Sequence, residues 1–289
     1  MSEEALLKPI TLGDLELENR VIMAPISINK ANNEHNAPND FYVNFYKQRA
    51  SAGLIISEGS QISRQATGCS NSAGIYLQEQ IEGWKKVTDA VHDEGGKIFN
   101  QLSHAGRMSH PDFLNGQIPL APSAINPNSK IHTHDGFKET VEPKALETEE
   151  VKRVVQDFKK AAKNAVDAGF DGIEIQSADG YLIHQFFNIS SNKRSDEYGG
   201  SLKNRARILF EILNAVKVFF PEQRIAVRLN PSCHKQFGIK ADGETISTFE
   251  YIVKKLNNYN LAYLHLSEPS TDVSKIDFLV NNVAKHFRP

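Results

Sequence analysis

A cationic side chain lies inside an apolar segment of the sequence. Arg228 belongs to Ile225–Leu229, a short run of the kind that forms a buried strand. A buried cation is costly unless it meets an anion or a buried hydrogen-bond acceptor. Arg228 is therefore predicted either to bind a ligand or to form a structural ion pair with a neighbouring glutamate.

Two more polar residues follow apolar segments. Ser27 comes just after Val21–Ala24 and could donate its hydroxyl to a ligand, although serine also stabilises turns at such positions. Gln101 ends the segment Lys97–Gln101, and its amide both donates and accepts hydrogen bonds. That property suits the edge of a heterocycle such as a pyrimidine ring, and a structural hydrogen-bonded glutamine is the alternative.

Short β-rich apolar segments alternate with longer amphipathic segments along the chain, which is the pattern of strands alternating with helices. The predicted strands would therefore position these three residues. Six strand–helix units are predicted. Their strands cover residues 21–24, 54–57, 97–101, 172–175, 225–229 and 262–266, and their helices cover 40–51, 80–94, 149–168, 202–219, 247–257 and 273–287. Gly169 and Pro221 are typical of helix ends, and Thr11–Leu17 predicts a small hairpin around a Gly-Asp turn.

The six units are compatible with an open doubly wound sheet or with a barrel. No predicted strand is followed by a G-x-G-x-x-G turn, and the third and fourth loops between strand and helix are very long. The pattern therefore favours an α/β fold of the TIM (β/α)8 type, with about six units in one domain over residues 1–289 and the hairpin at the barrel bottom. Active sites of such barrels lie at the carboxyl ends of the strands.

Composition excludes several classes of protein. The 289 residues are 40% hydrophobic and 24% charged, which is typical of a globular protein. A net charge of -2 gives no electrostatic reason to expect nucleic acid or an anionic membrane, so a small-molecule partner is expected. Cys69 and Cys233 have neither metal-site nor disulfide spacing, and no signal or membrane segment is seen. We expect a cytoplasmic protein without a metal site.

One long loop carries a specific resemblance. The segments Glu174–Phe186 and Ser191–Ser201, with Asn204–Arg207 after them, resemble the signature of the Old Yellow Enzyme family of FMN-dependent ene-reductases. The resemblance extends over about residues 9–287. It is also carried by Asn19-Arg20-Val21, Ala24-Pro25, Ile56–Gly59, Gln101–Arg107, Ala121–Ala124 and Leu264–Pro269.

The resemblance implies an enzyme that reduces activated C=C bonds with non-covalent FMN and NAD(P)H. Tyr181 is expected to be the proton donor to an electrophilic alkene. Arg228 is expected to stabilise the anionic reduced flavin, Ser27 to raise its potential and Gln101 to hold its pyrimidine edge. The residues implied around the flavin ring are Pro25, Ser27, Gly59, Gln101 and Arg228.

The substrate-binding pair departs from the family pattern. Members usually carry His and His, or His and Asn, at the positions of Gln176 and Asp179, so that two donors bind the substrate carbonyl. Glutamine can still donate, whereas ionised aspartate only accepts and would oppose the negative charge that develops there. Activity on ordinary enones is therefore predicted to be weak or absent unless Asp179 is protonated. Ser103 replaces a bulkier residue of many relatives, which predicts a roomier pocket.

The sequence ends in its sixth predicted unit, whereas loops after the seventh and eighth strands bind phosphate in this fold. We therefore expect that the family's phosphate-binding residues are not in it. An incomplete gene product, a half completed by another chain or by self-association, and a degenerate relative are the explanations considered. The alternative function is a flavin-free, non-catalytic binding or interaction protein. A lyase or aldolase would need a strand-end lysine or a metal cluster, and neither is found.

Overall fold

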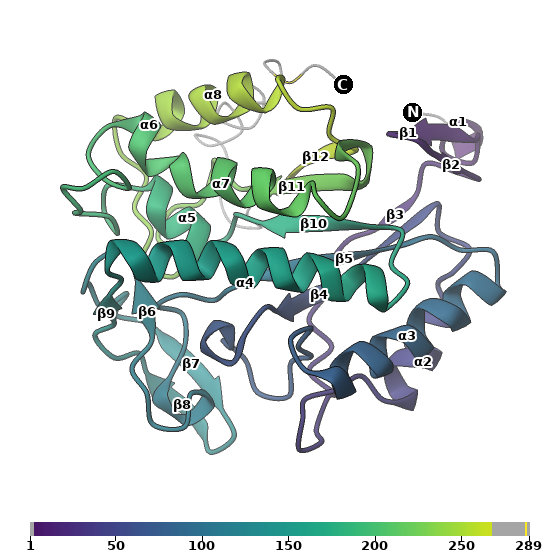
Figure 1. Ribbon diagram of the computed structural model, residues 1–289, viewed down its shortest axis with the longest axis horizontal. Helices are drawn as coiled ribbons and strands as arrows, with labels where there is room; N and C mark the ends of the chain where they lie inside the picture. The colour runs from purple at the N-terminus through teal and green to yellow at the C-terminus, as the bar shows by residue number, and fades with distance from the viewer. Residues whose placement is uncertain (1–2, 268–286, 288–289) are drawn as a thin grey trace.

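The computed structural model describes residues 3–267 and residue 287, and a parallel six-stranded sheet forms its centre (Figure 1). The strand order is β12-β11-β10-β5-β4-β3, so each strand lies beside its predecessor in the series. This connectivity is that of consecutive units of a TIM-type barrel, as predicted. The strands are β3 (Ile22–Met23), β4 (Leu54–Gln61), β5 (Ile98–Ser103), β10 (Gly172–Gln176), β11 (Ile225–Leu229) and β12 (Tyr263–Leu266).

Helices follow the strands as expected, and two short helices, Glu3–Leu6 and Leu182–Phe187, were not predicted. They are α1 (Glu3–Leu6), α2 (Asp40–Lys47), α3 (Gln78–Asp93), α4 (Thr148–Asp167), α5 (Leu182–Phe187), α6 (Leu202–Arg205), α7 (Arg207–Val216) and α8 (Thr245–Leu256). The single helix predicted over residues 202–219 is wrong: it is divided at Ala206 and ends three residues early. The helix predicted at 273–287 lies outside the described residues, except for its last residue.

A hairpin closes the end of the sheet where the strands begin. Strands β1 (Ile10–Leu12) and β2 (Leu15–Leu17) pair antiparallel around Gly13, whose φ is +64°. Leu15 and Leu17 pack in one cluster with Leu54 and Phe99 at the start of β4 and β5. The predicted position of the hairpin at the barrel bottom is confirmed.

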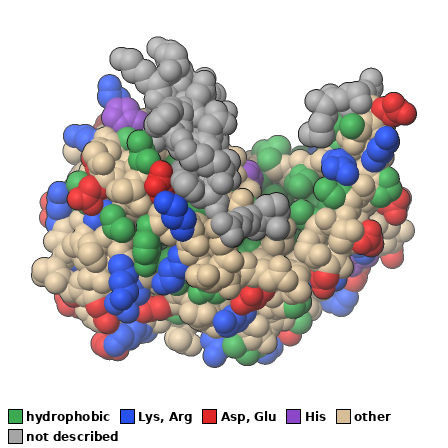
Figure 2. Space-filling model, turned by 90° about the horizontal axis from the view of Figure 1, so that it is seen from above, with side chains coloured by type: hydrophobic (Ala, Val, Ile, Leu, Met, Phe, Trp, Pro, Cys, Tyr) green, Lys and Arg blue, Asp and Glu red, His purple; other side chains and the backbone are tan. Residues whose placement is uncertain are grey.

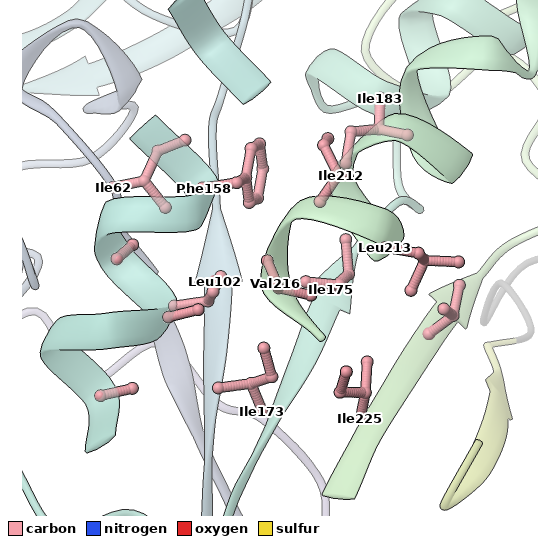
Figure 3. Packing of buried hydrophobic residues seen from close by; sticks show 14 of the residues in the cluster. Ile62, Leu102, Phe158, Ile173, Ile175, Ile183, Ile212, Leu213, Val216 and Ile225 are labelled. Atoms are coloured by element: carbon pink, nitrogen blue, oxygen red, sulfur yellow. The ribbon is translucent and has the colours of Figure 1, made fainter. Parts of the chain in front are cut away.

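The main hydrophobic core lies between the sheet and its helices. Alternate residues of the strands point toward the helices, as Ile173 and Ile175 of β10 do (Figure 3). They face Phe158 of α4 and Ile212 and Val216 of α7. Full burial of one such side chain stabilises the fold by roughly 1.5–3 kcal/mol. Glu174, which lies between them in sequence, points to the inner face of the sheet, where it meets Gln101 of β5.

The long connection from β5 to α4 has small strands of its own. β6 (Leu120–Ala121) pairs parallel with β9 (Lys144–Ala145), and β7 (Lys130–Thr133) pairs antiparallel with β8 (Gly136–Glu139).

Acidic and basic side chains are interspersed over the described part of the face in Figure 2. No helix in the described ranges has the length and apolarity needed to cross a membrane.

Candidate active site

One cavity of about 200 Å3 opens at the carboxyl ends of the strands. The eight residues predicted to bind the flavin or to act on the substrate all line it, although they come from five separate segments of the chain, and Ser103 lines it as well. Their convergence is a property of the parallel sheet, which brings the ends of its strands to one edge. The eight residues are Pro25, Ser27, Gly59, Gln101, Gln176, Asp179, Tyr181 and Arg228.

Strand register sets the floor of this cavity. Gly59 of β4 is paired with Gln101 of β5, just after a register shift in β4 of the kind common near active sites. A side chain at Gly59 would place its Cβ 3.2 Å from Gln101 Oε1, so glycine leaves the amide room. On the next pair of strands, Gln176 of β10 lies opposite Arg228 of β11.

A buried carboxylate orients Gln101. Glu174 is fully buried, and its Oε1 accepts a hydrogen bond of 2.7 Å from Gln101 Nε2. His265 Nδ1 lies 3.0 Å from the other oxygen, Oε2. Because the Nε2 of Gln101 is bound to Glu174, its carbonyl oxygen is directed elsewhere. Sequence reasoning did not single out Glu174 for this role.

A second buried carboxylate, Glu58, holds the loop that carries Ser27. Its Oε2 accepts hydrogen bonds from the backbone amides of Ile28 at 2.6 Å and Asn29 at 3.3 Å. Its Oε1 accepts from the hydroxyl of Tyr42 at 2.6 Å. Burial raises the pKa of the Glu58 carboxyl, and these hydrogen bonds act in the opposite direction. Exposed Ser27 is thus placed by a buried anchor.

The loop between β10 and α5 presents the residues expected to act on substrate. Asp179 and Gly180 both have positive φ, +56° and +77°, which turns the chain sharply before α5. The amide of Gly180 donates to His184 Nδ1 at 3.2 Å, and Gln185 Nε2 donates to the carbonyl of Gly180 at 2.8 Å. Two buried side chains of α5 therefore fix the loop.

Tyr181 ends this turn and faces the cavity. Its ring stacks on Phe237, with centroids 6.0 Å apart and planes inclined by 27°. Burial raises the pKa of the Tyr181 hydroxyl above its ordinary value, and the charge of Asp179 adds to that effect while Arg228 opposes it. The hydroxyl is therefore protonated near neutral pH, as a proton donor must be.

Arg228 forms an ion pair, but its partner is not the glutamate considered from the sequence. Its Nη2 lies 3.0 Å from Asp179 Oδ2. The other carboxylate oxygen, Oδ1, accepts from Asn230 Nδ2 at 2.7 Å and from Ser267 Oγ at 3.2 Å. Every partner of the carboxylate in the described part of the chain is a donor. Gln176, in contrast, makes a single hydrogen bond within the described ranges, in which its Oε1 accepts from the amide of Ala178 at 3.3 Å.

Several lining residues were not predicted as part of the site. Glu58 and Gln61 lie on β4 beyond Ser57, where the predicted strand ended because the apolar pattern stops there. Cys69 and Phe237 lie in loops that gave no pattern at all. The extension of β4 by polar residues was the one signal available, since a polar strand end in a barrel faces the site.

The chain was compared with known proteins. Residues 5–284 match the model of the NADH:flavin oxidoreductase / NADH oxidase family. The chain is 40% identical over 267 residues to 12-oxophytodienoate reductase 1 of Oryza sativa subsp. japonica, covering 91% of this chain and 68% of that protein. It is 38% identical over 283 residues to a probable flavin mononucleotide-dependent alkene reductase of Leishmania infantum, covering 96% and 75%. Morphinone reductase in complex with tetrahydroNAD is similar in structure, with a TM-score of 0.90 at 39% identity, covering 98% and 78%.

Proposed function

Because the chain belongs to the NADH:flavin oxidoreductase / NADH oxidase family, in which the Old Yellow Enzymes fall, we propose that it is an FMN-dependent NAD(P)H oxidoreductase of activated C=C bonds. The observation that carries the proposal is the convergence of all eight candidate residues on one cavity. The relatives named above are reductases, so the flavin-free interaction protein is not favoured. The net reaction adds hydride from NAD(P)H and a proton across the double bond.

The cavity fits a flavin ring. Arg228 Nε is buried and has no hydrogen-bond partner in the described part of the chain, so it needs an acceptor. The acceptor edge of a flavin would supply one. We propose that Pro25, Ser27, Gly59 and Gln101 hold the ring together with Arg228. Bound FMN would supply the hydride-transfer chemistry that amino-acid side chains lack.

The substrate is proposed to be a small electrophilic alkene bound by Gln176 and Tyr181. The Nε2 group of Gln176 makes no hydrogen bond within the described residues and is available to a carbonyl oxygen. The protonated hydroxyl of Tyr181 would deliver the proton. The carboxylate of Asp179 already accepts from Arg228, Asn230 and Ser267, and it has no donor to offer to the substrate carbonyl. The carbonyl is thus held by one donor where the family pattern has two.

The first test is the colour of the purified chain. We expect FMN to bind and its visible absorption to bleach on addition of NADPH. If the protein shows no flavin absorption after FMN addition, the proposed FMN-dependent activity is excluded.

The second test measures cyclohexenone reduction by the FMN-loaded chain beside a Gln176→His, Asp179→Asn double variant. Restoring a second donor is expected to raise kcat/KM on the order of 100-fold. Equal, high rates for both proteins would show that Gln176 and Asp179 do not limit enone reduction.

A further inference from the structure

A second cavity of about 110 Å3 adjoins the first. Gln61, Cys69 and Ser72 line both cavities, so the two spaces meet at these side chains. We call the second cavity the annex. Its far wall includes Arg64 and Asp112.

The side chain of Gln61 is oriented within this shared wall. Its Nε2 donates to Ser72 Oγ at 2.6 Å and to the carbonyl oxygen of Gly59 at 3.3 Å. A carbonyl oxygen can only accept, so the amide cannot be turned round without losing that bond. The Oε1 atom therefore faces away from Gly59.

This oxygen lacks a partner. Gln61 is only 7% exposed, and its Oε1 is buried without a hydrogen bond in the described part of the chain. A buried acceptor left unpaired costs free energy, and only a donor can satisfy it. A ketone, ester or carboxylate has no hydrogen to offer, whereas a hydroxyl or a carboxamide has one.

The charges around the annex disfavour a cationic occupant. Asp112 is already bound by Lys138 Nζ at 2.5 Å and by His110 at 3.0 Å, so it is not available to a cation. Arg64 adds a positive charge to the same wall. Burial raises the pKa of the Cys69 thiol, which keeps the passage between the cavities uncharged.

From these contacts we propose that the annex is a substrate subsite that binds a neutral hydroxyl or carboxamide substituent of the alkene through Gln61 Oε1. The subsite rests on the proposed function, because the alkene itself is held in the main cavity. It narrows the substrate class to alkenes that carry a hydrogen-bond donor on a short chain.

Two cyclohexenones test the subsite with the FMN-loaded protein: one carries a 2-hydroxyethyl chain on the ring, and the other a propyl chain of the same length. The natural chain is expected to prefer the hydroxyethyl compound by about tenfold in kcat/KM, the effect of one hydrogen bond. Gln61→Met removes the acceptor at nearly constant volume and should abolish the preference. The matched control is Gln65→Met, because Gln65 Oε1 is also buried without a partner in the described ranges but lies outside both cavities.

Cys69→Leu is a second variant, which should obstruct the passage and slow both chain-bearing ketones relative to plain cyclohexenone. A preference that is absent in the natural chain, or that survives both Gln61→Met and Cys69→Leu, overturns the subsite and assigns the annex to solvent. Failure to reduce any of the three ketones would instead contradict the proposed function, on which the subsite rests.

Discussion

The carboxylate of Asp179 and the guanidinium of Arg228 meet at the wall of the cavity, with side chains only 16% and 17% exposed. At this depth a charge acts strongly on a neighbouring ring, because little water screens it. The positive charge of Arg228 would favour an anionic reduced flavin. The negative charge of Asp179 offsets part of that effect. The reduction potential of bound FMN is therefore expected to be lower than it would be beside Arg228 alone.

Replacing Asp179 with asparagine should therefore make reduction of bound FMN easier. We expect the two-electron midpoint potential of the Asp179→Asn variant to rise by about 30 mV or more, which corresponds to a tenfold change in the redox equilibrium. Spectroelectrochemical titration measures it. Asp14→Asn is the control, because Asp14 pairs with Arg224 at the opposite end of the molecule. An unchanged potential in Asp179→Asn would mean that the pair does not act on the ring.

The residues themselves were largely predictable, and their partners were not. A cation inside an apolar strand had to meet either a ligand or an anion. Arg228 in fact has an anionic partner, and its Nε has no hydrogen-bond partner among the residues that the structure describes. The choice of Asp179 over a glutamate depends on the pairing of β10 with β11, which places Gln176 beside Arg228. Such proximity belongs to the tertiary structure and has no local pattern in the sequence.

At the scale of elements, the six residues of α5 are all buried, although the signature loop was not predicted to contain a helix. α5 packs inside the molecule and has no solvent-facing polar side. Its sequence therefore lacks the alternation of apolar and polar residues at helical spacing by which a surface helix is predicted. The long helices were predictable because each has one apolar face. His184, at the centre of α5, accepts from Gly180 and stacks edge-on against Phe249.

The burial of His184 makes acid stability a test of this element. Burial lowers the pKa of His184 to about 4. In the unfolded chain its pKa is about 6.5, so the unfolded state gains protons first and stability falls as pH drops from about 6.5 to about 4. We expect His184→Gln to lose less stability over this interval, by on the order of 3 kcal/mol, in urea unfolding at several pH values. Exposed His234 provides the control variant His234→Gln, and coincident pH profiles for the natural chain and His184→Gln would contradict the assignment.

At the scale of the whole molecule, one end of the sheet is closed and the other is open. The hairpin of β1 and β2 lies at the end where the strands begin (Figure 1). The cavity opens at the other end. Gly13 fits against the chain before β11 so closely that a Cβ there would lie 2.1 Å from the carbonyl oxygen of Gln223. The order of strands and the site of the cavity followed from the predicted fold, whereas this contact between distant segments did not.

Gly13→Ala should destabilise the protein without changing its affinity for FMN. The left-handed backbone costs about 1–2 kcal/mol for alanine, and overpacking against Gln223 adds about 1–3 kcal/mol. Gly95→Ala separates the two causes, because Gly95 has a φ of +78° and its added Cβ would have no neighbour within 4 Å among the described residues. Thermal unfolding and FMN titration of both variants give the comparison. Equal losses of stability would show that Gln223 yields freely to the new methyl group.

The junction of the two cavities also bears on the handedness of the product. A substrate bound only at Gln176 can rotate about that hydrogen bond and offer either side of its double bond to the flavin. A substrate bound at Gln176 and at Gln61 together cannot, because two fixed points leave one side facing the ring. The enantiomeric excess of the reduced ketone would therefore be higher for the hydroxyethyl compound than for its propyl analogue.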